Sequence, residues 1–160
     1  MVARFSVTHA RFPWLLILYL WTWLSAGCSQ DPYGLGKTAP VRGRVLVGDV
    51  PLHNGIVTFQ PDSPKGNHSP HQPSAAITES GTYELFTVGK GAAPLGWYKV
   101  MVSAYELDSD IAKRAKSPGE AGRLAKSLIH PKYEDLKTTP LSIEVVENPA
   151  PGAYDLKLTR

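Results

Sequence analysis

The residue with the most distinctive chemistry in this sequence is Cys28, the single cysteine among 160 residues. It supplies a thiol that can be acylated. Two small residues, Ala26 and Gly27, come directly before it, and small side chains fit the narrow groove of a peptidase. Ser25 and Leu24 precede these two at the end of an apolar run. This order of residues predicts chain cleavage in front of Cys28 and lipid attachment to its thiol.

The stretch that leads to Cys28 has the organisation of an export signal. Arg4 and Arg11 make its beginning positive, no acidic residue is present there, and residues 14–24 are largely apolar. This apolar run has the length of a signal-peptide core and is shorter than the about 20 residues that a membrane-spanning helix needs. An uncleaved transmembrane anchor is the alternative, which the three bulky tryptophans of the run would favour. We expect residues 1–27 to be a signal peptide that is removed.

The cleavage segment resembles the bacterial lipobox, in which a Leu three residues before the Cys is followed by two small residues. Ala26 and Gly27 match the two small positions. Ser25 stands where Leu is usual, and Leu24 lies one place early. The resemblance implies a lipoprotein held by several acyl chains, such as palmitate. Because each buried CH₂ contributes about 0.8 kcal/mol, several chains would make the anchoring effectively permanent.

The lipobox also implies a location and a first partner. The partner is membrane lipid, through acylated Cys28, and the location is the envelope of a bacterial cell, with the domain outside the cytoplasm. Residue 29 is Ser, not the Asp that retains some lipoproteins at the inner membrane. We therefore favour the outer membrane if the source has two membranes.

The charge of the chain gives no indication of nucleic-acid binding. The formal net charge is +3, but Arg4 and Arg11 belong to the leader. Without these two of the 17 basic residues, the remaining 15 nearly balance the 14 acidic ones, so the rest of the chain lacks the basic excess typical of nucleic-acid-binding proteins. Since Cys28 is the only cysteine, the exported domain must fold without a disulfide.

After Cys28 the sequence predicts a tether and then one all-β domain. Residues 28–39 contain the lipidated cysteine and a segment rich in Gly, Pro and small polar residues, typical of a flexible linker. From residue 40 to 160 apolar residues alternate with polar ones, which indicates strands with one buried face. The seven predicted strands cover residues 41–47, 54–60, 75–79, 82–87, 97–104, 139–146 and 153–159. Seven short strands separated by turns predict a β-sandwich.

Four segments of these strands carry a family resemblance. They are Val-Arg-Gly-Arg-Val at 41–45, Asn-Gly-Ile-Val-Thr-Phe at 54–59, Thr-Glu-Ser-Gly-Thr-Tyr at 78–83 and Gly-Trp-Tyr-Lys-Val-Met-Val at 96–102. In this order they resemble the carboxypeptidase regulatory-like domains, also called transthyretin-like or prealbumin-like, over residues 40–158. Residues 127–135 are similar to small bacterial lipoproteins of that group. The resemblance implies a seven-stranded Greek-key sandwich without enzymatic activity, often an accessory to folding or adhesion.

The sequence offers little support for catalysis or for a metal or other cofactor. No Gly-x-Ser-x-Gly motif surrounds a serine, and the chain ends Lys-Leu-Thr-Arg, not in the Tyr-Arg-Gly-Ser-type tail of the transthyretin-like hydrolases. His68 and His71 could be offered as two metal ligands, but Pro70 between them forbids a helix. His53 and His130 are far away in the sequence and no Cys can join them, so a solvated loop is the better interpretation. A hydrolase stays as the weakest alternative.

Trp97 and Met101 are the candidate ligand contacts. Trp97 and Tyr98 are adjacent, so they point to opposite faces of their strand, and an inward Tyr98 makes Trp97 outward. An outward Trp beside Met101 could stack on a sugar ring, which would make the domain a carbohydrate-binding module of the envelope. The alternative is that the insertion at residues 105–130 covers Trp97.

The 105–130 insertion precedes the sixth predicted strand and is helical or disordered. Leu107, Ile111 and Ala115 fall at helical spacing around a possible cap at Asp108. The segment holds the one cationic run of the chain, which is usually a solvated face but could add attraction to an anionic membrane. We expect a non-catalytic domain that binds an envelope protein or glycan.

Overall fold

The computed structural model describes residues 31–107 and 109–160. The predicted signal peptide, the lipobox with Cys28 and the proposed helix cap at Asp108 lie outside the described residues. The chain divides into two units, Met1–Pro32 and Tyr33–Arg160, and all the strands and helices given below belong to the second.

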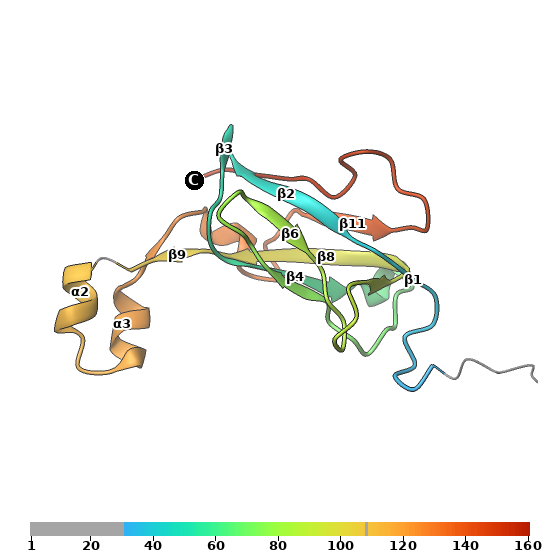
Figure 1. The fold of residues 1–160 in the computed structure, drawn as a ribbon, viewed down its shortest axis with the longest axis horizontal. Coiled ribbons are helices and arrows are strands. Elements are labelled where there is room, and N and C mark those ends of the chain that lie inside the picture. The colour runs from blue at the N-terminus through green and yellow to red at the C-terminus, as the bar shows by residue number, and fades with distance from the viewer. Residues whose placement is uncertain (1–30, 108) are drawn as a thin grey trace, which may run out of the picture. The chain divides into compact units, whose positions relative to one another are not determined.

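One four-stranded sheet has the order β11-β8-β4-β5, and all its pairings are antiparallel (Figure 1). Its strands are β4 (Ile56–Pro61), β5 (Ser74–Ala76), β8 (Gly96–Ser103) and β11 (Ser142–Val145). The long strand β8 lies in its middle, because six residues of β4 pair with one edge of β8 and four residues of β11 pair with the other.

The second sheet is built around β2. Its strands are β2 (Arg42–Val47), β3 (Val50–Pro51), β6 (Thr82–Glu84) and β12 (Leu156–Leu158). β3 and β6 pair with β2 in antiparallel orientation, whereas β12 pairs with β2 in parallel orientation. The first long strand of the domain is therefore joined directly to the last strand.

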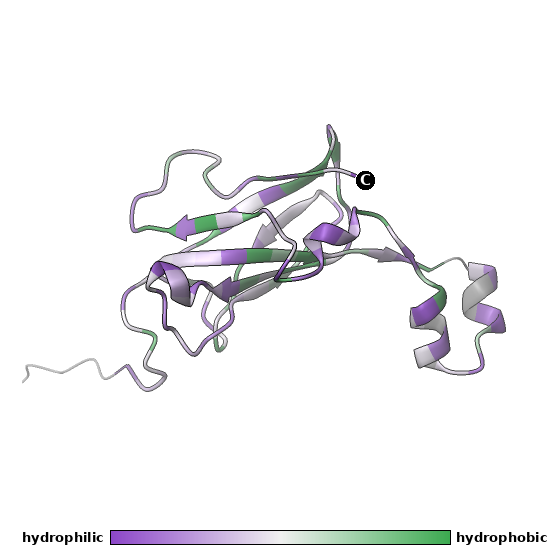
Figure 2. Cartoon of the chain, turned by 180° about the vertical axis from the view of Figure 1, so that it is seen from behind, coloured by the Kyte–Doolittle hydropathy of each residue, from purple (hydrophilic) through white to green (hydrophobic). Residues whose placement is uncertain are grey.

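The core lies between the two sheets and follows the alternation of each strand. Figure 2 shows hydrophobic and hydrophilic residues alternating along the strands. The Phe59 ring on β4 has its centroid 6.4 Å from the Tyr83 ring on β6 and 5.7 Å from the Tyr98 ring on β8, so aromatic side chains of both sheets meet. Fully buried strand residues include Val45, Val57, Phe59, Tyr98, Val100 and Val102. The all-β class and the inward direction of Tyr98, Val100 and Val102 are confirmed.

Packing begins before residue 40, where the sequence places the start of the domain. β1 (Thr38–Ala39) pairs with β7 (Ala93–Pro94), and Leu35 is buried. The last part of the expected tether is thus folded with the domain. The sequence did not predict β1 for two reasons. The segment is rich in Gly and Pro, and a two-residue strand leaves no alternating pattern.

The insertion between β8 and β11 contains a narrow ribbon and two short helices. β9 (Tyr105–Glu106) pairs with β10 (Lys126–Ser127), and α2 (Ser109–Arg114) and α3 (Pro118–Leu124) lie between them in the chain. The Glu134 carboxylate accepts a hydrogen bond from the Tyr105 hydroxyl and lies 2.7 Å from Ser127 Oγ, so it joins both strands of the ribbon to the segment after it. Among the described residues no helix is long and apolar enough to cross a bilayer.

Candidate functional site

Trp97 lies on the outer face of the β11-β8-β4-β5 sheet and is half-buried. Its cover comes from η1 (Ser63–Lys65), a short 3-10 helix, and not from the insertion that the alternative interpretation favoured. Lys65 Nζ lies 3.9 Å from the Trp97 ring centroid, which is a cation–π contact, and donates a hydrogen bond of 2.8 Å to Ser142 Oγ on β11.

The loop after β4 is fixed over this face through the backbone of Trp97. The Trp97 carbonyl oxygen accepts hydrogen bonds from the Asp62 backbone N–H at 3.0 Å and from Asn67 Nδ2 at 2.9 Å. Asp62 and Asn67 are both buried, so these bonds are protected from water. Lys65 is therefore held near the Trp97 ring by its own segment of chain.

Met101 shares the outer face with Trp97, four residues and about 13 Å further along β8. Lys99 lies between them on the same face, opposite Gln60 of β4. Beside Lys99 a hollow of about 410 Å³ is lined in part by Gln60, Leu136 and Lys137. The structure thus places the two predicted contact residues on one surface, next to a hollow that neither of them lines.

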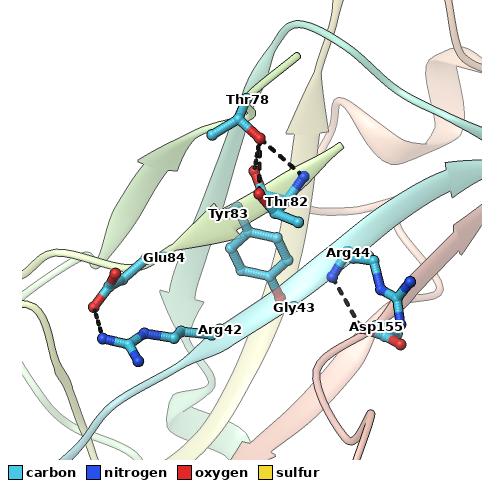
Figure 3. A pocket seen from close by; sticks show the side chains of 8 residues that line it. All are labelled: Arg42, Gly43, Arg44, Thr78, Thr82, Tyr83, Glu84 and Asp155. Carbon is cyan, nitrogen blue, oxygen red and sulfur yellow. Dashed lines mark hydrogen bonds and ion pairs between the residues drawn. The ribbon is translucent and has the colours of Figure 1, made fainter. Parts of the chain in front are cut away.

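A second hollow, of about 430 Å³, lies over β2 and β6 on the other sheet (Figure 3). Sequence reasoning did not find it. It is lined by Arg42, Gly43, Arg44, Thr78, Thr82, Tyr83, Glu84 and Asp155. The register of β2 and β6 explains why these side chains lie together, because Arg42 lies opposite Glu84 and Arg44 lies opposite Thr82. The two arginines alternate with Val41, Gly43 and Val45, and that alternation is the only signal in the sequence that points to this face.

The charges of this hollow are only partly paired. An Arg42 guanidinium nitrogen lies 2.8 Å from Glu84 Oε1, and this hydrogen bond, together with the charge attraction, raises the pKa of Arg42. The Arg42 side chain is 72% exposed and the Glu84 side chain is 36% exposed, so solvent screens the pair and it contributes little to stability. Asp155 Oδ1 accepts a 2.9 Å hydrogen bond from the Arg44 backbone N–H. In the described part of the chain the Arg44 guanidinium has no ion pair.

Three hydroxyl groups form a cluster at the edge of the same hollow. Thr78 Oγ1 lies 2.7 Å from Thr82 Oγ1 and 2.9 Å from Ser80 Oγ, and the latter two are 3.1 Å apart. Within residues 31–107 and 109–160 none of the three is hydrogen-bonded to a His, Asp or Glu side chain. A hydroxyl needs such a base to become a good nucleophile, and these three hydroxyl groups are hydrogen-bonded to one another instead.

Tyr83 forms the base of the hollow. Its hydroxyl donates a 2.7 Å hydrogen bond to the Tyr154 carbonyl oxygen, and burial, followed by the nearby Asp155 charge, raises the pKa of Tyr83. Gly43 lies against the same carbonyl group, where a Cβ atom would be 2.2 Å from the oxygen. The missing side chain lets β2 approach the segment before β12, which brings Asp155 to the rim.

The two loop histidines lie apart from both hollows. His71 Nε2 is 2.7 Å from the Tyr33 carbonyl oxygen, and His68 is exposed. No group of three His, Cys, Asp or Glu side chains in the described ranges is arranged to hold a metal ion.

These observations define an all-β domain with two four-stranded sheets and an open hollow on the outer face of each. Comparison with protein-family models, with curated proteins and with solved structures finds no match to this chain. Function is therefore argued from its residues and geometry alone.

Proposed function

We propose that this protein is a lipid-anchored component of the bacterial cell envelope, in which the all-β domain has a structural or interaction role and no catalytic one. The observation that carries the proposal is the lipobox-like segment 24–28 after an apolar run. Its cysteine is the attachment point, and membrane lipid is the first partner. The second partner is an envelope protein or a glycan.

The domain is proposed to be a seven-stranded Greek-key sandwich of the carboxypeptidase regulatory-like type. Each of the seven strand segments predicted from the sequence contains a strand, and the two sheets pack face to face through their aromatic side chains. The parallel pairing of β12 with β2 supports the proposal, because it brings the last strand of the sheet beside the first long one.

An interaction role fits the chemistry of the outer faces better than catalysis does. The hydroxyl cluster of Thr78, Ser80 and Thr82 is satisfied within itself and with the Thr82 backbone. The Arg44 guanidinium and the Arg42–Glu84 pair offer charged groups at an open surface. Such groups suit reversible recognition of a polar partner.

A carbohydrate-binding module is the second candidate, and the outward direction of Trp97 favours it. Lys65 covers one side of the ring, so a stacked sugar would need the other side or would displace the lysine. Glycan-array binding that is lost in Trp97→Ala and strengthened in Lys65→Ala would support this candidate. Tyr105→Ala, another exposed aromatic residue, is the control and should bind like the wild type.

The anchor is tested by the N-terminus of the protein expressed in a bacterial host. Mass spectrometry should show a chain that begins at Cys28 and carries acyl chains. Cys28→Ser should leave an unprocessed precursor, because only a thiol forms the thioether on which this processing depends. An unmodified Cys28, or a mature chain that starts elsewhere, would contradict the lipoprotein proposal.

A further inference from the structure

The turn between β6 and β7 places a valine in an unfavourable backbone conformation. Val88 has φ 49°, and within residues 31–107 and 109–160 it is the only residue other than glycine with a positive φ. The following Gly89 has φ 77°, and Thr87 and Lys90 exchange backbone hydrogen bonds of 2.8 and 3.0 Å. Two central residues with positive φ define a type I′ hairpin turn. Asn, Asp or Gly is usual at the position of Val88.

Packing does not explain the choice of valine. A β-branched side chain is among the least suited to the left-handed region, because its Cβ substituents crowd the backbone. Val88 is 48% exposed, so it fills no space in the core. An exposed, strained, apolar residue at a hairpin tip indicates that the side chain is needed for something outside the domain.

Two further exposed apolar side chains accompany Val88. Phe86 is 52% exposed. Phe86 and Val88 are the two neighbours in the chain of Thr87, which is buried. Tyr33 is 49% exposed, and Lys90 Nζ lies 5.8 Å from its ring centroid. The pairing of β1 with β7 independently holds the N-terminal segment beside this hairpin. We call Tyr33, Phe86, Val88 and Lys90 the hairpin patch.

The length of the chain limits how far this patch can lie from Cys28. Tyr33 follows Cys28 by five residues, which span at most about 18 Å whatever their conformation. If Cys28 carries lipid, as proposed above, Tyr33 is therefore held close to the bilayer surface. The composition of the patch suits that position, because Tyr favours the membrane–water interface, Phe and Val favour hydrocarbon, and Lys favours anionic headgroups.

We propose that the hairpin patch inserts into the outer part of the bilayer that holds the lipid anchor. This inference rests on the proposed lipidation of Cys28. The hairpin then acts as a second, non-covalent contact that fixes the orientation of the domain on the membrane. The hollows on the two sheets then have a fixed orientation relative to the membrane surface.

Lipid contact at the tip is measured with the acylated full chain in phosphatidylethanolamine–phosphatidylglycerol vesicles. An environment-sensitive fluorophore is attached to the thiol of Val88→Cys. Because acylation blocks the thiol of Cys28, the fluorophore labels position 88 alone. Val50→Cys is the matched control, because Val50 is 57% exposed and begins β3, after the turn at the opposite end of β2. Nitroxide-labelled lipids should quench the probe at position 88 at least threefold more strongly than at position 50. Equal quenching at the two positions, or none, would overturn the inference.

Val88→Asn separates insertion from folding. Asn tolerates a positive φ, so the thermal midpoint should stay the same or rise. In that background a probe at Lys90→Cys should lose at least half of its quenching by lipid. Unchanged quenching would show that Val88 does not contact lipid, and a lowered midpoint would show that valine serves the fold.

The mass of the purified chain distinguishes the two proposals. Acylated Cys28 with an unquenched probe at position 88 means that only the hairpin inference is wrong, and another occupant, such as an apolar pocket of a protein partner, covers the patch. A Cys28 without lipid overturns both proposals.

Discussion

The hydroxyl of Tyr83 donates a hydrogen bond to the backbone carbonyl oxygen of Tyr154 at 2.7 Å, and both residues are buried. The bond joins β6 to the segment before β12, which are 71 residues apart in the chain. It runs past Gly43 of β2, so three separate segments of the sheet meet at one point. This contact is the first place to test how the sheet is held together.

Tyr83→Phe should destabilise the domain by about 1–3 kcal/mol, since a buried carbonyl group loses its donor while the ring stays in place. Urea unfolding followed by circular dichroism measures this loss. Tyr105→Phe is the control, because that hydroxyl bonds Glu134 at an exposed position. A loss in Tyr105→Phe as large as that in Tyr83→Phe would contradict the importance given to burial.

Stability should fall as the pH rises above about 10. Burial raises the pKa of Tyr83 and of Tyr98 above the ordinary value of 10.0, so the folded state favours the neutral phenols. Their contribution is complete below pH 10 and is lost as the unfolded state begins to ionise. Urea unfolding at several pH values from about 8 to 11 tests this. Tyr83→Phe should weaken the dependence, and an unchanged slope in that variant would assign the effect to other groups.

Gly43→Ala should cost about 1–3 kcal/mol or more, because the new Cβ would lie 2.2 Å from the Tyr154 carbonyl oxygen and would force β2 away from it. Gly122→Ala in α3 is the matched control. A Cβ there meets nothing within 4 Å, and alanine favours a helix interior over glycine by about 1 kcal/mol. Thermal midpoints of both variants should therefore move in opposite directions. A midpoint in Gly43→Ala equal to that of the wild type would mean that the two segments are not in close contact.

Replacing residues 109–124 with a short Gly/Ser link should leave the β signal and the thermal midpoint nearly unchanged. The replaced part comprises α2 and α3, while the ribbon strands and the Tyr105–Glu134 bond at its base are kept. Halving the length of a loop changes its closure entropy by only about 0.6 kcal/mol. A large drop in the midpoint would show that the helices cover part of the core.

The inward residues of the domain were predictable, because a strand with one buried face repeats every two residues. Val45, Val57 and Val100 are all fully buried as their alternation indicates. The two-residue strands β1 and β3 could not be found in this way, since two residues are too few to show a period. They depend on pairing with partners elsewhere in the chain.

The surfaces were harder to predict than the core. The outward direction of Trp97 follows from that of Tyr98, but its cover by Lys65 depends on how a loop 32 residues earlier folds back. The hollow of Figure 3 needs Arg44, Thr82 and Asp155 to meet, and they come from three separate parts of the chain. Val88 lies between the predicted strands 82–87 and 97–104, and its strained backbone could not be predicted, because it depends on φ and not on the residue type alone.

The parallel pairing of β12 with β2 has a consequence for the order of synthesis. Leu156 lies opposite Val45, so the earliest long strand acquires this neighbour only when the final strand has been made. Until then one edge of β2 offers unpaired backbone groups, and such an open edge is a template for aggregation. A growing chain thus cannot close its second sheet while its end is still being assembled. If the chain is exported as proposed, the open edge of β2 would persist until β12 has crossed the membrane, and the second sheet would close only then.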